Sequence, residues 1–154
     1  MNKLALLFAA LFALSAVANE FVGRVTKVSD GDTIWVVTEG KREKVRLDRI
    51  DAPEKNQKFG KEASAILADM INGKEVRVEW KKRDQYGRVL GVVFAGEKEV
   101  NLEMIRKGAA WHYSHFDKTA EYAEAEKAAR EAKVGLWKEQ NPINPYDWRK
   151  KGKK

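Results

Sequence analysis

Two short stretches of the sequence each place a pair of carboxylates around a turn. Asp30–Thr33 (DGDT) opens one predicted strand, and Asp51–Glu54 (DAPE) follows the next predicted strand along the chain. If these strands pair, their ends meet and bring up to four carboxylates into a small volume. Carboxylates packed together repel one another unless a cation neutralises them. Because all the candidate ligand atoms are oxygens, the two turns together predict a hard cation, Ca²⁺ or Mg²⁺.

Two arginines are placed to add positive charge to this cluster. Arg46 lies five residues before Asp51, on the predicted strand that ends at Ile50 and on the face opposite Val45, and Arg88 starts a later strand after a turn. A guanidinium offers a rigid fork of donors that matches two phosphate oxygens, so two arginines beside a bound cation form a clamp for a phosphoryl group. Taken singly, each arginine is an ordinary surface residue and each acidic turn an ordinary solvated turn. Their combination carries the prediction.

The apolar pattern predicts the elements that hold these residues. Alternating apolar residues between turn signals predict five strands, and an apolar stripe at helical spacing predicts a helix that ends at Gly73. Asn101 is predicted to cap a short helix that Gly108 ends. The predicted strands are Phe21–Val28, Thr33–Thr38, Glu43–Ile50, Glu75–Lys81 and Arg88–Phe94, and the two longer helices cover Ala63–Ile71 and Thr119–Lys133.

Five strands and three helices, with the first three strands consecutive, predict an α+β fold. The expected architecture is a five-stranded OB-fold β-barrel with three packed α-helices. One domain over residues 19–148 accounts for the pattern, because 154 residues are too few for two ordinary domains. The basic stretch Trp148–Lys154 is predicted to be frayed, with residues 149–154 forming a C-terminal tail.

The composition excludes several classes of protein. Hydrophobic residues make up 44% of the chain, enough to bury a core, which excludes a mainly disordered protein. Cysteine is absent, which excludes disulfide scaffolds, cysteine nucleophiles and iron–sulfur clusters. The 30 Lys and Arg residues against 23 Asp and Glu residues give a net charge of +7. This excess favours a polyanionic partner such as nucleic acid, an anionic membrane or an acidic polysaccharide.

The first 18 residues are typical of a secretory signal peptide. Lys3 precedes an apolar run from Leu4 to Leu14, and small residues follow, with cleavage predicted after Ala18. The apolar stretch is about fifteen residues long, shorter than the roughly 20 that a membrane-spanning helix requires. We therefore expect a secreted or periplasmic protein with no membrane contact after cleavage.

Further motifs, together with the two acidic turns, resemble one known family. They are Val45–Leu47, Gly60–Ser64, Asp84–Arg88, Val100–Leu102, Gly108–Trp111, Gly135–Trp137 and the stretch from Asn144 to Arg149. In this order the motifs resemble the thermonuclease, or staphylococcal-nuclease-like, family of Ca²⁺-dependent secreted nucleases. The resemblance spans residues 21–149, nearly all of the chain that follows the predicted cleavage point.

The resemblance implies a cation site and a water-activating group. Asp32 and Asp51 match the family's calcium ligands, and the backbone carbonyl of Ala52 completes the protein's share of the ligands. Glu54 matches the carboxylate that acts as general base or orients the attacking water. The implied reaction is hydrolysis of the P–O5′ bond of DNA or RNA, leaving 3′-phosphate ends. Separately from the resemblance, a monomer is the default expectation, because the sequence shows no sign of a dimer interface.

The resemblance also implies contacts to the substrate. Arg46 and Arg88 match the two phosphate-clamping arginines, and Tyr86 matches a tyrosine near the bound phosphate. Tyr113 is the candidate for the family's base-stacking tyrosine, with Ser114 or a neighbour as the alternative.

Several weaker patterns leave more than one interpretation open. His112 and His115 are more typical of surface or packing residues than of a zinc pair. Asp48 shares a predicted strand face with Arg46 and can pair with it. Lys81–Arg83 is either a solvated turn or a contact to a nucleic-acid backbone. Core packing is the default expectation, against base stacking, for Trp35, Trp80, Trp111 and Trp137.

Two other functions compete with the nuclease hypothesis. One is a catalytically inactive OB-fold module that only binds nucleic acid, and the other is a surface protein that binds polyanions through its basic face. Neither rival needs the complete set of candidate residues, which favours the nuclease. The complete set is Asp32, Arg46, Asp51, Glu54 and Arg88.

Overall fold

The computed structural model describes residues 18–152, so the predicted signal peptide, apart from Ala18, lies outside the described residues. Within the described part, no helix is long and apolar enough to cross a membrane. The strands are β1 (Asn19–Asp30), β2 (Thr33–Thr38), β3 (Lys41–Leu47), β4 (Ile50–Asp51), β5 (Glu75–Arg83), β6 (Val89–Ala95), β7 (Lys98–Glu99) and β8 (Trp111–His112). The helices are α1 (Gly60–Ile71), α2 (Val100–Arg106), α3 (Ala120–Glu131), the 3₁₀ helix η1 (Gly135–Lys138) and α4 (Pro145–Lys151).

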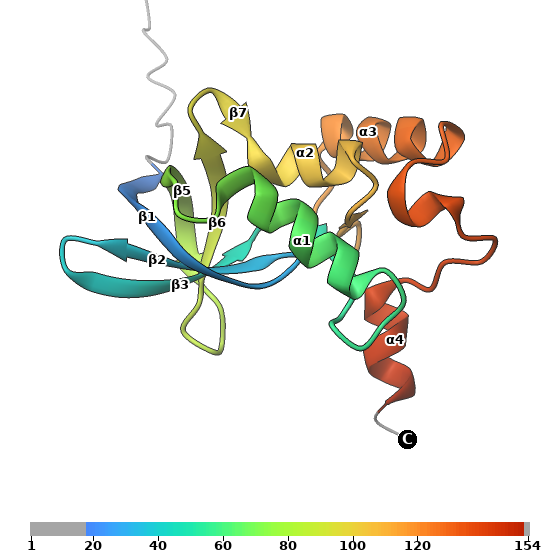
Figure 1. Ribbon diagram of the computed structural model, residues 1–154, viewed down its shortest axis with the longest axis horizontal. Coiled ribbons are helices and arrows are strands. Elements are labelled where there is room, and N and C mark those ends of the chain that lie inside the picture. The colour runs from blue at the N-terminus through green and yellow to red at the C-terminus, as the bar shows by residue number, and fades with distance from the viewer. Residues whose placement is uncertain (1–17, 153–154) are drawn as a thin grey trace, which may run out of the picture.

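Five of these strands close into a barrel (Figure 1). Antiparallel pairs join β1 to β2, β2 to β3, β1 to β5 and β5 to β6, and a parallel pair between β3 and β6 completes the circle. The short strand β7 extends β6 as a hairpin, and β4 pairs only with β8. The predicted α+β class with a five-stranded OB-fold barrel is therefore confirmed.

The barrel is filled by alternate residues of its strands. Val36 of β2 and both Val45 and Leu47 of β3 are fully buried, and Leu67 of α1 packs in the same cluster. Because successive side chains of a strand point to opposite faces, Arg46 lies on the outer face of β3. The predicted division of this strand into a buried and an outer face is confirmed.

The third predicted strand, Glu43–Ile50, is interrupted. β3 ends at Leu47, a turn follows, and Arg49 adopts a positive φ of 67° that bends the backbone sharply. The chain resumes as β4, in which Asp51 lies opposite Trp111 of β8. The Arg49 carbonyl also accepts a hydrogen bond of 2.8 Å from the Tyr113 backbone N–H. The bend takes Asp51 out of the barrel sheet, and the pairing of β4 with β8 places it beside residues 111–113.

The C-terminal segment is more ordered than the sequence predicted. The expected frayed stretch from Trp148 is wrong as far as Lys151, because these residues belong to α4, a fourth α-helix beyond the three expected. The helix begins with Pro145, and the Asn144 side chain caps it by accepting the Tyr146 backbone N–H at 3.0 Å. In Figure 1, α4 lies at the lower right, below the loop that leads into α1.

Asn101 has a different role from the predicted cap. Glu99 occupies the cap position of α2, and Asn101 lies inside the helix with its side chain fully buried. Its Oδ1 accepts the Val93 N–H at 3.0 Å, and its Nδ2 donates to the carbonyls of Asp48 (2.9 Å) and Gly91 (3.0 Å). Asn101 thus joins α2 to β6 and to the turn after β3. A buried amide is retained there because all these polar partners are satisfied.

Candidate active site

Asp32 lies at the mouth of the barrel, just before β2. It is 7% exposed, and its Oδ1 accepts the Thr33 hydroxyl at 3.0 Å while its Oδ2 accepts the Ala52 N–H at 2.9 Å. Gly31 permits this approach, because a Cβ there would lie 2.7 Å from the Ala52 Cβ and 2.9 Å from the Ala63 Cβ. The two acidic turns that the sequence predicted to meet do meet in the structure.

Arg46 links the two aspartates of these turns. Its Nη2 lies 3.2 Å from Asp32 Oδ2 and 3.2 Å from Asp51 Oδ1. Its Nη1 donates to the carbonyls of Leu47 and, at 2.9 Å, Ile50. The alternative pairing of Arg46 with Asp48 is wrong, because Asp48 Oδ1 instead accepts the backbone N–H of the next residue at 2.9 Å. Two carboxylates and two backbone carbonyls therefore fix the Arg46 guanidinium.

A third arginine, Arg149 of α4, completes the cluster. Its Nη1 and Nη2 lie 3.0 and 2.9 Å from the two carboxylate oxygens of Asp51, a bidentate pair. The same Nη1 donates to Glu54 Oε1 at 2.9 Å, and Nη2 donates to the Tyr113 hydroxyl at 3.3 Å. A residue placed in the expected C-terminal tail thus contacts three of the predicted site residues.

Glu54 is held by the loop that follows the DAPE turn. The Glu54 N–H donates to Gln57 Oε1 at 3.1 Å, and Gln57 Nε2 donates to the Ile143 carbonyl at 2.6 Å, so this buried amide ties the loop to the segment before α4. Gly60 is required by the close approach of the backbone, since a Cβ there would lie 1.9 Å from the Glu54 carbonyl oxygen. The backbone of Glu54 is therefore fixed, although its side chain remains 36% exposed.

Arg88 and Tyr86 form a second group beside the first. The parallel pairing of β3 with β6 places Leu90 opposite Arg46, so Arg88 stands immediately before the strand next to Arg46. Arg88 Nε donates to Asp84 Oδ2 at 2.7 Å, and its guanidinium lies 5.6 Å from the ring centre of Tyr86. Tyr86 is 75% exposed. Among the described residues, neither Arg88 nor Tyr86 forms a hydrogen bond or ion pair with Asp32 or Asp51.

Tyr113 lies with the aspartates. Besides its contact to Arg149, its ring centre is 5.9 Å from the Arg46 guanidinium carbon, and its ring packs edge-on against Phe116 at 4.7 Å. Burial raises the pKa of its hydroxyl, and the nearby charge of Asp51 adds to the rise. Tyr113, the predicted base-stacking residue, therefore lies at the edge of the site, with Phe116, His115 and Tyr146 as aromatic neighbours.

Burial dominates the electrostatics of the aspartates. It raises the pKa of Asp51 above its ordinary value, against the opposing effect of the Arg149 and Arg46 guanidiniums. Burial and the neighbouring Asp32 raise the pKa of Asp30 to about 6. Negative charge in this cluster is therefore costly, and an added cation would lower its free energy.

The residues predicted to hold a cation fit a hard metal ion. Within residues 18–152 no group of three or more His, Cys, Asp or Glu side chains is placed to hold one. Asp32 and Asp51, however, each have an oxygen within reach of the same Arg46 atom, and the Ala52 backbone adjoins Asp32. Two carboxylates and a backbone carbonyl are hard oxygen donors, and Ca²⁺ takes its roughly six to eight ligands from such groups and from water. The other two carboxylates of the turns lie beside this pair, because Asp30 accepts the Asp32 backbone N–H at 3.0 Å and Glu54 shares the Arg149 guanidinium with Asp51.

The remaining candidates pack elsewhere. His112 bonds to Asp117 at 2.8 Å, and the His115 ring stacks on Tyr146 at 4.1 Å. Trp111 and Trp137 are buried against each other with ring centres 4.6 Å apart, which confirms their predicted packing role. Trp35 differs, because it lies half-buried on the outer face of β2.

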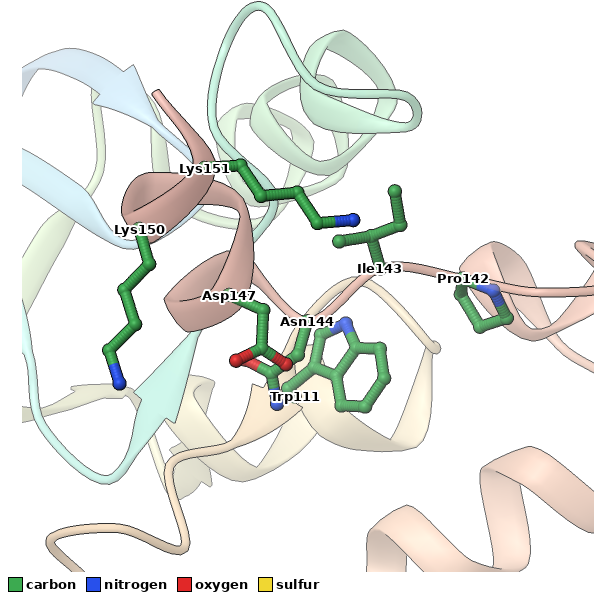
Figure 2. Close-up of a pocket in the computed structure, with 7 residues that line it drawn as sticks. All are labelled: Trp111, Pro142, Ile143, Asn144, Asp147, Lys150 and Lys151. Carbon is green, nitrogen blue, oxygen red and sulfur yellow. The ribbon is translucent and has the colours of Figure 1, made fainter. Parts of the chain in front are cut away.

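An open pocket of about 710 Å³ lies on another side of α4. Figure 2 shows Asp147, Lys150 and Lys151 of this helix around it, with Trp111 beside Asp147 and Asn144. Arg149 does not line this pocket, because it faces the aspartates. The pocket therefore lies apart from the acidic cluster.

Sequence reasoning missed the parts played by Arg149 and Gln57. Arg149 ends the Asn144–Arg149 motif of the resemblance, and it lies one helical turn after Pro145. Because proline favours the first turn of a helix, this spacing could have predicted a helix here in place of a frayed tail. Gln57 carries no such signal, because its role depends on a contact across 86 residues of chain.

Replacement of Arg149 tests whether α4 is tied to the barrel by this ion pair. We expect Arg149→Gln to lower the free energy of unfolding by about 2 kcal/mol, below the roughly 3 to 5 kcal/mol of a fully buried pair, because it leaves Asp51 with one guanidinium. Urea unfolding gives the value, with Lys151→Gln as a matched loss of charge on the exposed side of the same helix. Equal stability of the two variants would contradict the assignment.

Comparison with known proteins identifies the family. The profile of the family described as staphylococcal nuclease homologue matches residues 44–139. A Haemophilus influenzae protein named "uncharacterized endonuclease" is 41% identical over 154 residues, covering 99% of this chain and 85% of the relative. A micrococcal nuclease of Shigella flexneri is 41% identical over 145 residues, which cover 87% of this chain and 83% of the relative. A staphylococcal-like nuclease of Arabidopsis thaliana is 44% identical over 110 residues, 71% of this chain and 34% of the relative. As the motifs predicted, the chain belongs to the staphylococcal nuclease homologue family.

Proposed function

We propose that the protein is a calcium-dependent nuclease that hydrolyses phosphodiester bonds of DNA and RNA. It cleaves the P–O5′ bond and leaves 3′-phosphate ends. The observation that carries this proposal is the meeting of Asp32, Asp51 and Arg46 at the barrel mouth, with Glu54 joined to the same cluster through Arg149. Buried carboxylates bridged by guanidiniums suit a site that binds a cation and a phosphate together.

Asp32, Asp51 and the Ala52 carbonyl would hold the calcium ion, which supplies positive charge next to a phosphate oxygen. Arg46 engages both carboxylates, so it contacts a phosphate by exchanging one of these contacts for a phosphate oxygen. The hydrogen bonds from Arg46 Nη1 to the Leu47 and Ile50 carbonyls keep the guanidinium in place during that exchange. The charge that develops on the phosphoryl group is then stabilised by a donor that is already oriented.

Glu54 acts on the attacking water. Arg149 occupies its Oε1, and its Oε2 makes no hydrogen bond to any residue of the described chain. With the side chain 36% exposed, this second oxygen can accept a proton from water or orient it. Gln57 and Gly60 fix the backbone from which Glu54 projects, so the carboxylate reaches a single region of the site.

Arg88 offers the second guanidinium. Only its Nε is bonded to Asp84, so both Nη groups keep their donors available among the residues described, and the side chain is 26% exposed. Two parallel N–H donors match two phosphate oxygens. Tyr86, exposed beside Arg88, is placed to contact the substrate next to that phosphate.

We also propose that the protein acts outside the cytoplasm, as a monomer. The positive residue, apolar run and small residues of the first 18 positions support export. Sequencing of the N-terminus of the exported protein should begin at Asn19, and a chain that retains Met1 outside the cytoplasm would contradict the cleavage.

The nuclease proposal is tested by digestion of plasmid DNA and single-stranded RNA with Ca²⁺ or with excess chelator. We expect Ca²⁺-dependent cleavage of both substrates, and we expect Glu54→Gln to lose several orders of magnitude in rate, because the water-activating oxygen is replaced by an amide. Glu62→Gln, an exposed change on α1, is the matched control and should cleave as the wild type does.

The outcomes separate a nuclease from an inactive binding module. End-group analysis should find 3′-phosphates on the products. Retarded but intact nucleic acid with every protein and both buffers would show an inactive binding module instead, and a wild-type rate for Glu54→Gln would remove Glu54 from the mechanism.

A further inference from the structure

The outer face of β1, β2 and β3 carries a tryptophan between basic residues. The strand register places Trp35 of β2 directly opposite Lys27 of β1 and Lys44 of β3. The Arg42 guanidinium lies over the indole, 4.2 Å from its centre, and the Lys44 ammonium lies 5.5 Å from it. Arg24 lies further along β1, opposite Val37 and two residue pairs from the Lys27–Trp35 pair. We call these five residues the β1–β3 basic face.

The cations of this face are not neutralised by the protein. Of the ten arginines in the sequence, eight form ion pairs with carboxylates of the described residues. The two that form none within residues 18–152 are Arg24 and Arg42, and both lie on this face. Lys27 and Lys44 also make no ion pair with a described carboxylate. Because the other eight arginines are all paired, the two unpaired arginines leave this surface free to bind an external anion.

The basic face continues from the candidate active site. Arg46, Lys44 and Arg42 alternate along the outer side of β3, so they follow one another at steps of about 7 Å. On β2, Thr33 lies opposite Arg46, and Trp35 follows on the same side. The hairpin of β2 and β3 projects from the barrel (Figure 1), so this row runs outward from the site. A polyanion bound at Arg46 would therefore meet further cations along β3.

We propose that the β1–β3 basic face binds a single-stranded segment of nucleic acid that extends beyond the cleaved bond. Phosphates lie against Lys44 and Arg42, and an unpaired base stacks on the platform formed by Trp35 and the Arg42 guanidinium. Bases stack on aromatic rings and on guanidinium planes, and this requires a base that is not enclosed in a duplex. The proposal rests on the proposed function, since the nuclease site fixes where the segment begins.

The test measures binding separately from cleavage. Fluorescence anisotropy of a long labelled single-stranded oligonucleotide, in the Glu54→Gln background and at several salt concentrations, compares two variants. Arg42→Gln with Lys44→Gln should weaken binding about tenfold and lower the slope of log K against log salt by about 1.4, from two phosphate contacts at roughly 0.7 each. Trp35→Leu should weaken binding about tenfold through lost stacking.

Two controls keep the proposal distinct from the proposed function. Lys98→Gln with Lys127→Gln removes the same charge from exposed positions of β7 and α3, and should leave the affinity and the salt slope near wild-type values. With active protein, the Arg42 and Lys44 double variant should cleave a dinucleotide as the wild type does and cleave the long oligonucleotide less efficiently.

Several results would overturn the proposal. Affinity of both face variants equal to that of the Lys98 and Lys127 control would show that the face does not bind the substrate. An equal loss of affinity for duplex DNA and for the single strand, with no effect of Trp35→Leu, would overturn the single-stranded assignment. A wild-type protein that cleaves neither length refutes the nuclease function alone, because the anisotropy result stands without cleavage.

Discussion

The Asp51 side chain is buried, with only 1% of the residue exposed, and an unpaired negative charge there would destabilise the fold by several kcal/mol. Much of the surrounding structure compensates for that charge. Arg46 approaches from the barrel wall and Arg149 from the C-terminal helix, so the first and last thirds of the described chain are joined at one side chain. The same neutralisation holds Asp32 and Glu54 in place, because each shares a guanidinium with Asp51.

This constraint explains features that the barrel alone does not require. Because the chain bends at Arg49, β4 leaves the barrel sheet and pairs with β8 instead. This pairing places Asp51 at the barrel mouth. Gly31 and Gly60 admit backbone contacts that any side chain would block, and these contacts bring Asp32 to Ala52 and fix Glu54. Helix α4 lies against the same region because Arg149 reaches the carboxylates. A stable barrel thus supports a site with buried carboxylates whose negative charge a bound cation can neutralise.

The sequence predicted the local features well and the long-range ones poorly. The alternation of Val45, Arg46 and Leu47 correctly separated the core from the outer face, because strand periodicity is a local property. The bend at Arg49 was missed, since a non-glycine residue at positive φ leaves no local signal. The roles of Arg149 and Asn101 were also not predicted. Both depend on partners far along the chain, which local propensities cannot reveal.

Calcium binding to the barrel mouth tests the central claim most directly. Isothermal titration calorimetry of Ca²⁺ into the protein without nucleic acid would compare the wild type, Asp32→Asn and the exposed control Asp69→Asn. If Asp32 and Asp51 form the cation site, the wild type and the Asp69 variant bind alike, and Asp32→Asn weakens the affinity by about tenfold or more. The same affinity for all three proteins, each shown to be folded, would contradict the account.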